Sequence, residues 1–145
     1  MLQRRVKNER IRMLKTGDAA RGPVIYWMSR DQRARDNWAL LHAQDIALEL
    51  RVPLAVVFCL VPSFLGATAR QYGFLLRGLE EIAASLGTLG IPFFLLKGDP
   101  GKELPRFLSR CRASKLVTDF DPLKIKRTWK SHVAGSIDIP FEEVD

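Results

Sequence analysis

Five short apolar segments alternate with helical patterns along this chain, and this alternation limits the folds that it can adopt. The segments are residues 23–28, 53–60, 91–98, 115–120 and 137–145. Between them, apolar residues recur every three or four positions, as they do on one face of a helix. Strands that are apolar on both sides and separated by helices form a parallel sheet covered on both faces. The sequence therefore predicts an α/β domain with a Rossmann-like, doubly wound sheet.

The five predicted strands, numbered in chain order, should form a parallel sheet in the order 3-2-1-4-5 with helices on both faces. Right-handed crossovers lead to this order and place a switch point between strands 1 and 4. Ligands of such sheets bind beyond the carboxyl ends of the strands at that point. Two segments should therefore meet there, residues 28–37 after strand 1 and residues 119–126 after strand 4.

Helices are predicted over residues 37–51, 69–89 and 122–135. A further helical pattern begins near residue 100, but Pro105 should break or restart it, because an internal proline removes a backbone hydrogen bond and clashes with the preceding turn. An apolar stripe on the second helix indicates the face that packs on the sheet. The stripe consists of Tyr72, Leu76, Leu79, Ala83, Leu86 and Leu89.

Basic residues are concentrated at the N-terminus. The chain has 145 residues and a formal net charge of +7, and the excess lies within residues 1–35. Residues 1–22 are interpreted as a basic lead-in helix and residues 23–145 as the Rossmann-like domain. Such a cluster can attract nucleic acid or an anionic surface, although a solvated helix face is the simpler explanation.

Several classes of protein are excluded by what the sequence lacks. No apolar run reaches the roughly 20 residues that cross a bilayer, and the charged N-terminus does not have the apolar centre of a secretion signal. The two cysteines have no metal-ligand spacing and are too few for a disulfide framework, so a cytoplasmic protein without a membrane partner is expected. Neither GxGxxG nor GxxxxGK[ST] occurs, and no glycine-flanked serine elbow is present. The sequence favours a binding domain over a complete catalyst.

The segment after the first strand, SRDQRARDN at residues 29–37, is highly charged and has no glycine. Two interpretations remain open. In the first, Asp36 caps the next helix, Asp31 pairs with an arginine, and the rest is exposed surface. In the second, the arginines and Asp31 build a rigid polar wall for a ligand or a second domain.

Two longer strings resemble class II cyclobutane pyrimidine dimer photolyases. They are YWMSRDQRARDNWALLHAQ, from residue 26, and LVTDFDPLKIKRTW, from residue 116. NERIRMLK near the N-terminus and QYGFLLRGLEE in the middle of the chain are similar to the same class. The likeness covers almost the whole chain, which is identified as a member of the photolyase and cryptochrome family. One departure is Asp121, where a serine is more usual in this class.

The resemblance implies the N-terminal antenna domain of a DNA-repair lyase. In that family a larger helical domain, which would follow residue 145, binds FAD and the flipped pyrimidine dimer. Light reaches reduced FAD directly or through an antenna pigment, a deazaflavin or a folate, and the excited flavin donates the electron that splits the dimer. The implied partners are UV-damaged DNA, through the full-length protein, and the helical domain. Residues 1–145 alone are expected to be inactive.

The resemblance also implies an antenna site between the two strand ends. Its predicted residues are Met28, Ser29, Arg30 and Asp31 on one side, and Asp119, Phe120, Asp121 and Lys124 on the other. We expect Asp119 or Asp121 to accept a hydrogen bond from the pigment, and Met28 or Phe120 to pack on its face. The alternative is that both aspartates only cap the following helix.

Two other functions stay open at this point. A stand-alone Rossmann-like module would bind a nucleotide or a pigment without repair chemistry, and a cryptochrome photoreceptor would share this domain. DNA binding by residues 1–145 is expected to be weak and salt-dependent, because only positive charges are available to displace counterions. Exposure of a surface that normally packs on the helical domain favours self-association.

Overall fold

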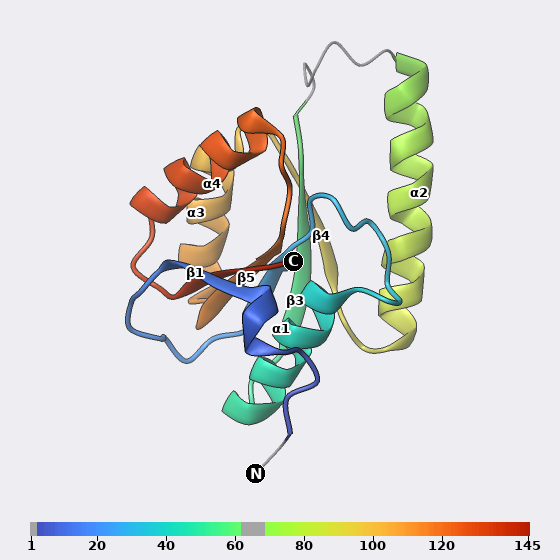
Figure 1. The fold of residues 1–145 in the computed structure, drawn as a ribbon. Helices are drawn as coiled ribbons and strands as arrows, with labels where there is room; N and C mark the ends of the chain where they lie inside the picture. The colour runs from blue at the N-terminus through green and yellow to red at the C-terminus, as the bar shows by residue number, and fades with distance from the viewer. Residues whose placement is uncertain (1–2, 62–68) are drawn as a thin grey trace.

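The computed structural model describes residues 3–61 and 69–145 and contains a six-stranded sheet between two layers of helices (Figure 1). The strands are β1 (Ile11–Lys15), β2 (Val24–Trp27), β3 (Leu54–Leu60), β4 (Phe93–Lys97), β5 (Lys115–Asp119) and β6 (Phe141–Val144). Their order in the sheet is β1-β6-β5-β2-β3-β4. The strands from β2 to β6 are parallel, so the predicted order 3-2-1-4-5 is confirmed for them.

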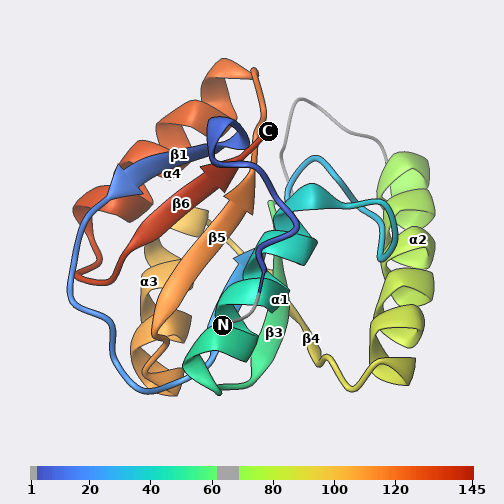
Figure 2. The same cartoon turned by 60° about the horizontal axis from the view of Figure 1, so that its bottom comes forward.

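Helices cover both faces of the sheet, as predicted (Figure 2). One layer consists of α1 (Trp38–Leu50) and α2 (Ala69–Thr88), and the other of α3 (Pro100–Cys111) and α4 (Lys124–Gly135). Successive strand side chains alternate between the layers. In β2, Val24 and Tyr26 join the core under α1 and α2, whereas Ile25 and Trp27 join the core under α3 and α4. None of the helices in the described ranges is long and apolar enough to cross a membrane.

The prediction of a lead-in helix is wrong. Residues 8–10 form one 3-10 turn, and residues 11–15 form β1, which pairs antiparallel with β6. The sheet is therefore six-stranded and mixed rather than five-stranded and parallel. Without β1, β6 would be an edge strand with unpaired backbone groups. Ile11 lies opposite Val144 and packs against the same core, a long-range contact that leaves no local signal in the sequence.

Two arginines of the lead-in are bound to α1. Arg4 Nε donates to Glu49 Oε1 at 2.9 Å, and Arg5 Nε donates to Asp45 Oδ1 at 2.9 Å. Asp45 is buried, and its Oδ2 also accepts from the backbone N–H of Arg5 at 2.9 Å. Part of the basic excess at the N-terminus is therefore neutralised by α1, and it serves to hold the lead-in on that helix.

Two details of the predicted helices are also wrong. α3 runs without a break through Pro105, between the buried Leu104 and Leu108. Burial of each leucine stabilises the folded state by about 1.5–3 kcal/mol. Together the two leucines offset the roughly 3 kcal/mol by which an internal proline destabilises a helix. α2 ends one residue earlier than expected, and Leu89 is 61% exposed because the chain turns at Gly90, whose φ is 73°.

β6 carries two neighbouring glutamates that are both buried and point to opposite faces of the sheet. Glu142 Oε1 lies 3.2 Å from His42 Nε2 and forms an ion pair with Lys115. Glu143 Oε2 accepts from Lys130 Nζ at 2.8 Å. Burial raises the pKa of Glu142, but the hydrogen bonds with His42 and Lys115 outweigh it and lower that pKa to about 2. Each glutamate thus links β6 to a helix or to a neighbouring strand through charge.

Glu142→Gln should remove part of the pH dependence of stability. Folding lowers the pKa of Glu142 from its ordinary value of 4.5 to about 2. The charged carboxylate therefore stabilises the fold fully above pH 4.5, and this stabilisation is lost as the pH falls toward 2. The free energy of unfolding of the wild type, from urea titrations, should therefore fall more steeply than that of the variant over this interval. At pH 7 the variant should be less stable by about 3 kcal/mol, because Lys115 loses its buried partner.

The matched control is Glu49→Gln, which breaks only the exposed ion pair with Arg4. This variant should lose less than about 1 kcal/mol at pH 7. Parallel acid profiles for the wild type and Glu142→Gln would show that Glu142 does not carry the expected pH dependence.

Candidate functional site

Asp119, the last residue of β5, is a buried carboxylate surrounded by donors from the end of β2. Oδ2 accepts from the backbone N–H groups of Ser29 at 3.0 Å and Asp31 at 3.1 Å, and from the Tyr26 hydroxyl at 2.8 Å. Oδ1 accepts from the backbone N–H of Arg30 at 2.9 Å. β2 and β5 are neighbours in the sheet, so this side chain fixes the backbone that follows β2.

Asn37 holds the other end of the same loop. Its Oδ1 accepts from the backbone N–H of Leu40 at 3.0 Å and caps α1. Its Nδ2 donates to the carbonyl of Asp31 at 3.0 Å and to the Tyr26 hydroxyl at 3.0 Å. Burial raises the pKa of Tyr26 well above its usual value, and Asp119 adds to the shift, so the hydroxyl stays protonated and donates to Asp119. A continuous hydrogen-bonded chain therefore runs from α1 to β5.

This geometry explains why the loop after β2 contains no glycine. In dinucleotide-binding folds, backbone N–H groups at this place surround a phosphate. Here the N–H groups of residues 29–31 surround the Asp119 carboxylate, an anion that the protein itself supplies. A phosphate at this position would meet a buried negative charge and donors that are already engaged. The loop is organised for something other than a nucleotide phosphate.

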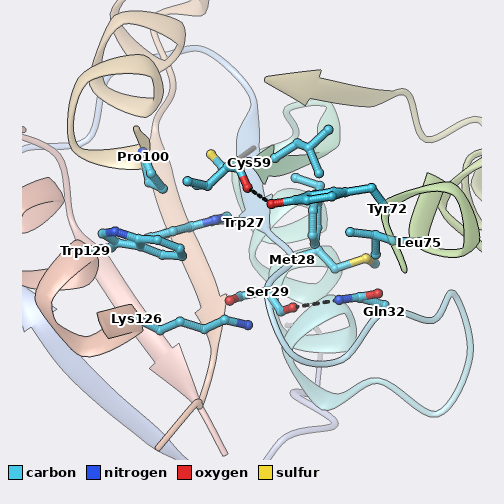
Figure 3. A pocket seen from close by; sticks show the side chains of 13 residues that line it. Trp27, Met28, Ser29, Gln32, Cys59, Tyr72, Leu75, Pro100, Lys126 and Trp129 are labelled. Atoms are coloured by element: carbon cyan, nitrogen blue, oxygen red, sulfur yellow. Dashed lines mark hydrogen bonds between the residues drawn. The ribbon is translucent and has the colours of Figure 1, made fainter. Parts of the chain in front are cut away.

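A cavity of about 80 Å³ lies beside the loop, beyond the carboxyl ends of β2 and β3 (Figure 3). Figure 3 shows Trp27 and Trp129 toward one side of it, and Tyr72 and Leu75 of α2 toward the other. Met28 completes the wall between them. Aromatic and aliphatic walls of this kind suit a flat aromatic ligand.

Polar groups lie along one edge of this cavity, from Ser29, Gln32 and Lys126. Lys126 Nζ is 2.9 Å from Asp121 Oδ2, and Asp121 Oδ1 accepts from the backbone N–H of Leu123 at 3.0 Å. Burial raises the pKa of Asp121, but Lys126 and the Leu123 N–H outweigh it, so the pKa lies below its usual value. The charged carboxylate keeps Lys126 at the cavity edge, where it can donate to a ligand.

Cys59 is the cysteine among the described residues that line the cavity. Burial, with smaller contributions from Glu103 and Asp99, raises the pKa of the Cys59 thiol to about 12. The thiol is therefore protonated at neutral pH and unreactive. Within residues 3–61 and 69–145, no group of histidine, cysteine and acidic side chains could hold a metal ion.

The structure brings several of the predicted site residues together. Met28 and Ser29 line the cavity, Asp119 fixes the loop behind it, and Asp121 positions Lys126. Asp119 caps no helix. Asp121 does not cap α4 either: the N-cap of that helix is Leu123, which has no side-chain cap, and Asp121 accepts from the backbone N–H of Leu123 just before the helix.

The other predicted residues do not line the cavity. Arg30 and Lys124 are exposed, and Phe120 is half-buried. Asp31 forms a half-exposed ion pair with Arg33, as the first interpretation of the loop expected. The same interpretation is wrong about Asp36, because the N-cap of α1 is Asn37. Asp36 itself is exposed and has a φ of 51°.

Apart from Met28 and Ser29, the residues that line the cavity were not predicted as site residues, and among them are Gln32, Tyr72, Lys126 and Trp129. Tyr72 reaches the site only because α2 packs on this side of the sheet. Lys126 had a detectable signal, since it follows Asp121 across the start of α4 and their opposite charges can pair there. The prediction chose Lys124 instead, which the same helix turns toward solvent.

Comparison with known proteins places this geometry in context. A family profile described as DNA photolyase matches residues 24–145. The deoxyribodipyrimidine photo-lyase of Arabidopsis thaliana is 50% identical over 97% of this chain and 30% of its own length. That of Potorous tridactylus is 50% identical over 83% of this chain and 23% of its own length. The chain therefore spans less than a third of these curated relatives.

A solved cryptochrome from Synechocystis sp. PCC6803 shares the fold, with a TM-score of 0.67 at 18% identity. The superposition covers 79% of this chain and 25% of the cryptochrome chain. At this identity, the likeness concerns the fold alone.

Asp119→Asn should loosen the loop after β2. An asparagine keeps the shape but must turn an N–H₂ group toward one of the donors around Asp119, so several charge-assisted hydrogen bonds weaken. The free energy of unfolding should fall by about 3 kcal/mol, and the amides of residues 29–31 should exchange hydrogen much faster. Asp121→Asn is the control: Asp121 bonds to the Leu123 N–H and to Lys126 rather than to those amides, so this variant should leave their exchange unchanged. Unchanged protection of residues 29–31 in Asp119→Asn would show that Asp119 does not hold the loop.

Proposed function

This chain belongs to the DNA photolyase family, and from that premise we propose that it is the antenna-chromophore domain of a deoxyribodipyrimidine photo-lyase. The full-length protein would use blue light and reduced FAD to split cyclobutane pyrimidine dimers in DNA. These residues would hold the pigment that collects light, a deazaflavin or a folate. We assign the flavin and the dimer to a helical domain outside this chain, which spans less than a third of its curated relatives.

The observation that carries this proposal is the fixed loop beside an aromatic cavity. An antenna is useful only if it is held at a constant distance and orientation relative to the flavin. Hydrogen bonds to Asp119 and Asn37 fix one wall of the cavity, and the ends of β2 and β3 fix another. A rigid, aromatic pocket meets the requirements of an antenna.

The residues fit an aromatic pigment in chemistry, but the cavity is narrow. Pockets for ligands of this size have volumes of about 300–1,000 Å³, whereas this cavity has about 80 Å³. Gln32 is the side chain best placed to give way, because it is exposed and its Nε2 donates to the carbonyl of Ser29 at 3.2 Å. We propose that this hydrogen bond breaks when the pigment enters.

In this proposal the polar contacts to the pigment come from Ser29, Gln32 and Lys126, while Met28 packs on the ring. Asp119 and Asp121 both accept hydrogen bonds from the protein. They would therefore act by positioning the loop and Lys126 rather than by accepting a hydrogen bond from the pigment. This assignment changes the role expected from the sequence and keeps both aspartates in the site.

The alternative of a stand-alone nucleotide-binding module has less support, because the donors that would bind a phosphate are engaged by Asp119. A cryptochrome photoreceptor would share the same domain. Light-dependent repair separates the two photoactive functions. A full-length protein that carries reduced flavin should convert a dimer-containing oligonucleotide under blue light, and failure to do so would favour a photoreceptor.

Pigment binding should depend on Lys126 and not on Lys124. We expect a deazaflavin to quench the fluorescence of Trp27 and Trp129, which line the cavity, and ATP to have no effect. Lys126→Met keeps the aliphatic stem but removes the donor, and it should weaken binding about tenfold, or about 1.4 kcal/mol. Lys124→Met removes the same charge from the exposed face of α4 and should bind like the wild type.

Three results would count against the antenna proposal. They are the absence of quenching of the wild type by either deazaflavin or folate, competition of ATP with the pigment, and an equal loss of affinity in the two lysine variants. The last result would show that the pigment binds elsewhere or responds only to net charge.

A further inference from the structure

Several cations that lie close to the sheet in the described part of the chain pair with a carboxylate. Arg5 pairs with Asp45, Lys126 with Asp121, and Lys130 with Glu143. Arg12 and Arg127 differ, because within residues 3–61 and 69–145 neither guanidinium has a hydrogen bond or an ion pair. Both arginines line the same hollow, which lies between β1 and α4 and has a volume of about 240 Å³.

The remaining lining of this hollow gives it a positive character. Lys130, Ser131 and Glu143 contribute its other polar groups. Lys130 is 4% exposed, and its Nζ donates to Glu143 Oε2 at 2.8 Å and to the carbonyl of Asp119 at 2.7 Å. Glu143, the one carboxylate among the described residues of the lining, is therefore already neutralised by a buried lysine. Arg12 and Arg127 add two uncompensated charges at the rim.

We infer that this hollow binds a phosphate group of a nucleic-acid backbone. Guanidinium groups present planar pairs of N–H donors that match phosphate oxygens, and the Ser131 hydroxyl can add another donor. Lys124 lies one turn before Arg127 on α4 and extends the row of cations beyond the hollow, which suits a polyanion better than a single small ion. The described residues of the lining include no aromatic side chain on which a base could stack, so the contact is with the backbone and not with bases.

The inference goes beyond the proposed antenna function and depends on it only in taking DNA as the nucleic acid. β1 and α4 form one edge of the molecule, and α2 lies toward the opposite edge (Figure 2). A phosphate bound between β1 and α4 would leave the antenna cavity accessible, because none of the residues of the hollow lines that cavity. The site would add a lesion-independent contact to DNA.

The test uses residues 1–145 and a fluorescently labelled, undamaged DNA duplex, with no pigment, flavin or light. The double variant Arg12→Gln/Arg127→Gln should bind about tenfold more weakly at low salt. The slope of log K against log salt should fall in magnitude by about 1 to 2, because one or two phosphate contacts are lost. Both side chains are exposed, so the variant should keep the wild-type melting temperature.

The matched control is Arg70→Gln/Arg77→Gln, which removes the same charge from exposed positions on α2. This variant should lose much less affinity and keep the wild-type slope. Equal losses in the two double variants would overturn the inference, because they would show that only net charge matters. The DNA-binding assay is independent of pigment binding. Failure to bind DNA would therefore leave the antenna proposal intact, and failure to bind a pigment would leave the proposed phosphate site intact.

Side-chain NMR signals of Arg12 and Arg127 distinguish the sources of phosphate. The Nε–Hε resonances of both should shift on addition of the duplex. A shift with inorganic phosphate at matched ionic strength but not with the duplex would overturn the nucleic acid as the ligand. Unchanged resonances with both ligands would overturn the site itself.

Discussion

The Asp119 carboxylate is the group on which the arrangement of this end of the molecule depends. An isolated buried carboxylate costs several kcal/mol, so it is stable only when donors surround it. Asp119 obtains them from three consecutive backbone N–H groups and the Tyr26 hydroxyl. Its own carbonyl accepts from Lys130 Nζ at 2.7 Å. One residue thereby ties together β2, β5 and α4, and Asn37 extends the network to α1.

Buried charges hold other parts of the sheet in the same way. β6 carries Glu142 toward α1 and Glu143 toward α4, and each is matched by a basic side chain. Asp45 is buried on α1 and matched by Arg5 of the lead-in. These pairs specify which elements become neighbours, because a mismatch would leave a charge buried without a partner. Arg12 and Arg127, at the hollow between β1 and α4, have no ion pair within residues 3–61 and 69–145 and are therefore available to a partner.

The antenna cavity follows from these constraints rather than from a sequence motif of its own. Its loop is rigid because Asp119 and Asn37 engage the backbone, and its inner wall is rigid because β2 and β3 are buried along their whole lengths. Its polar edge exists because Asp121 holds Lys126. A substitution of any of these supporting residues would alter the cavity without touching a bound pigment, which separates their role from that of Ser29 or Lys126 itself.

The sequence by itself determined the order of the parallel strands, the two helical layers and the strand ends at which the site lies. These follow from hydrophobic periodicity and from the handedness of crossovers, which act over short distances along the chain. It also identified Met28, Ser29, Asp119 and Asp121 at those ends. Only the tertiary structure decided that the lead-in is a strand, because the open edge of β6 lies at the other end of the chain. The tertiary structure also decided that Asp119 accepts hydrogen bonds from the loop after β2. It placed Lys126, rather than Lys124, at the cavity. Both outcomes depend on how β5 and α4 pack, and the local sequence pattern does not determine that packing.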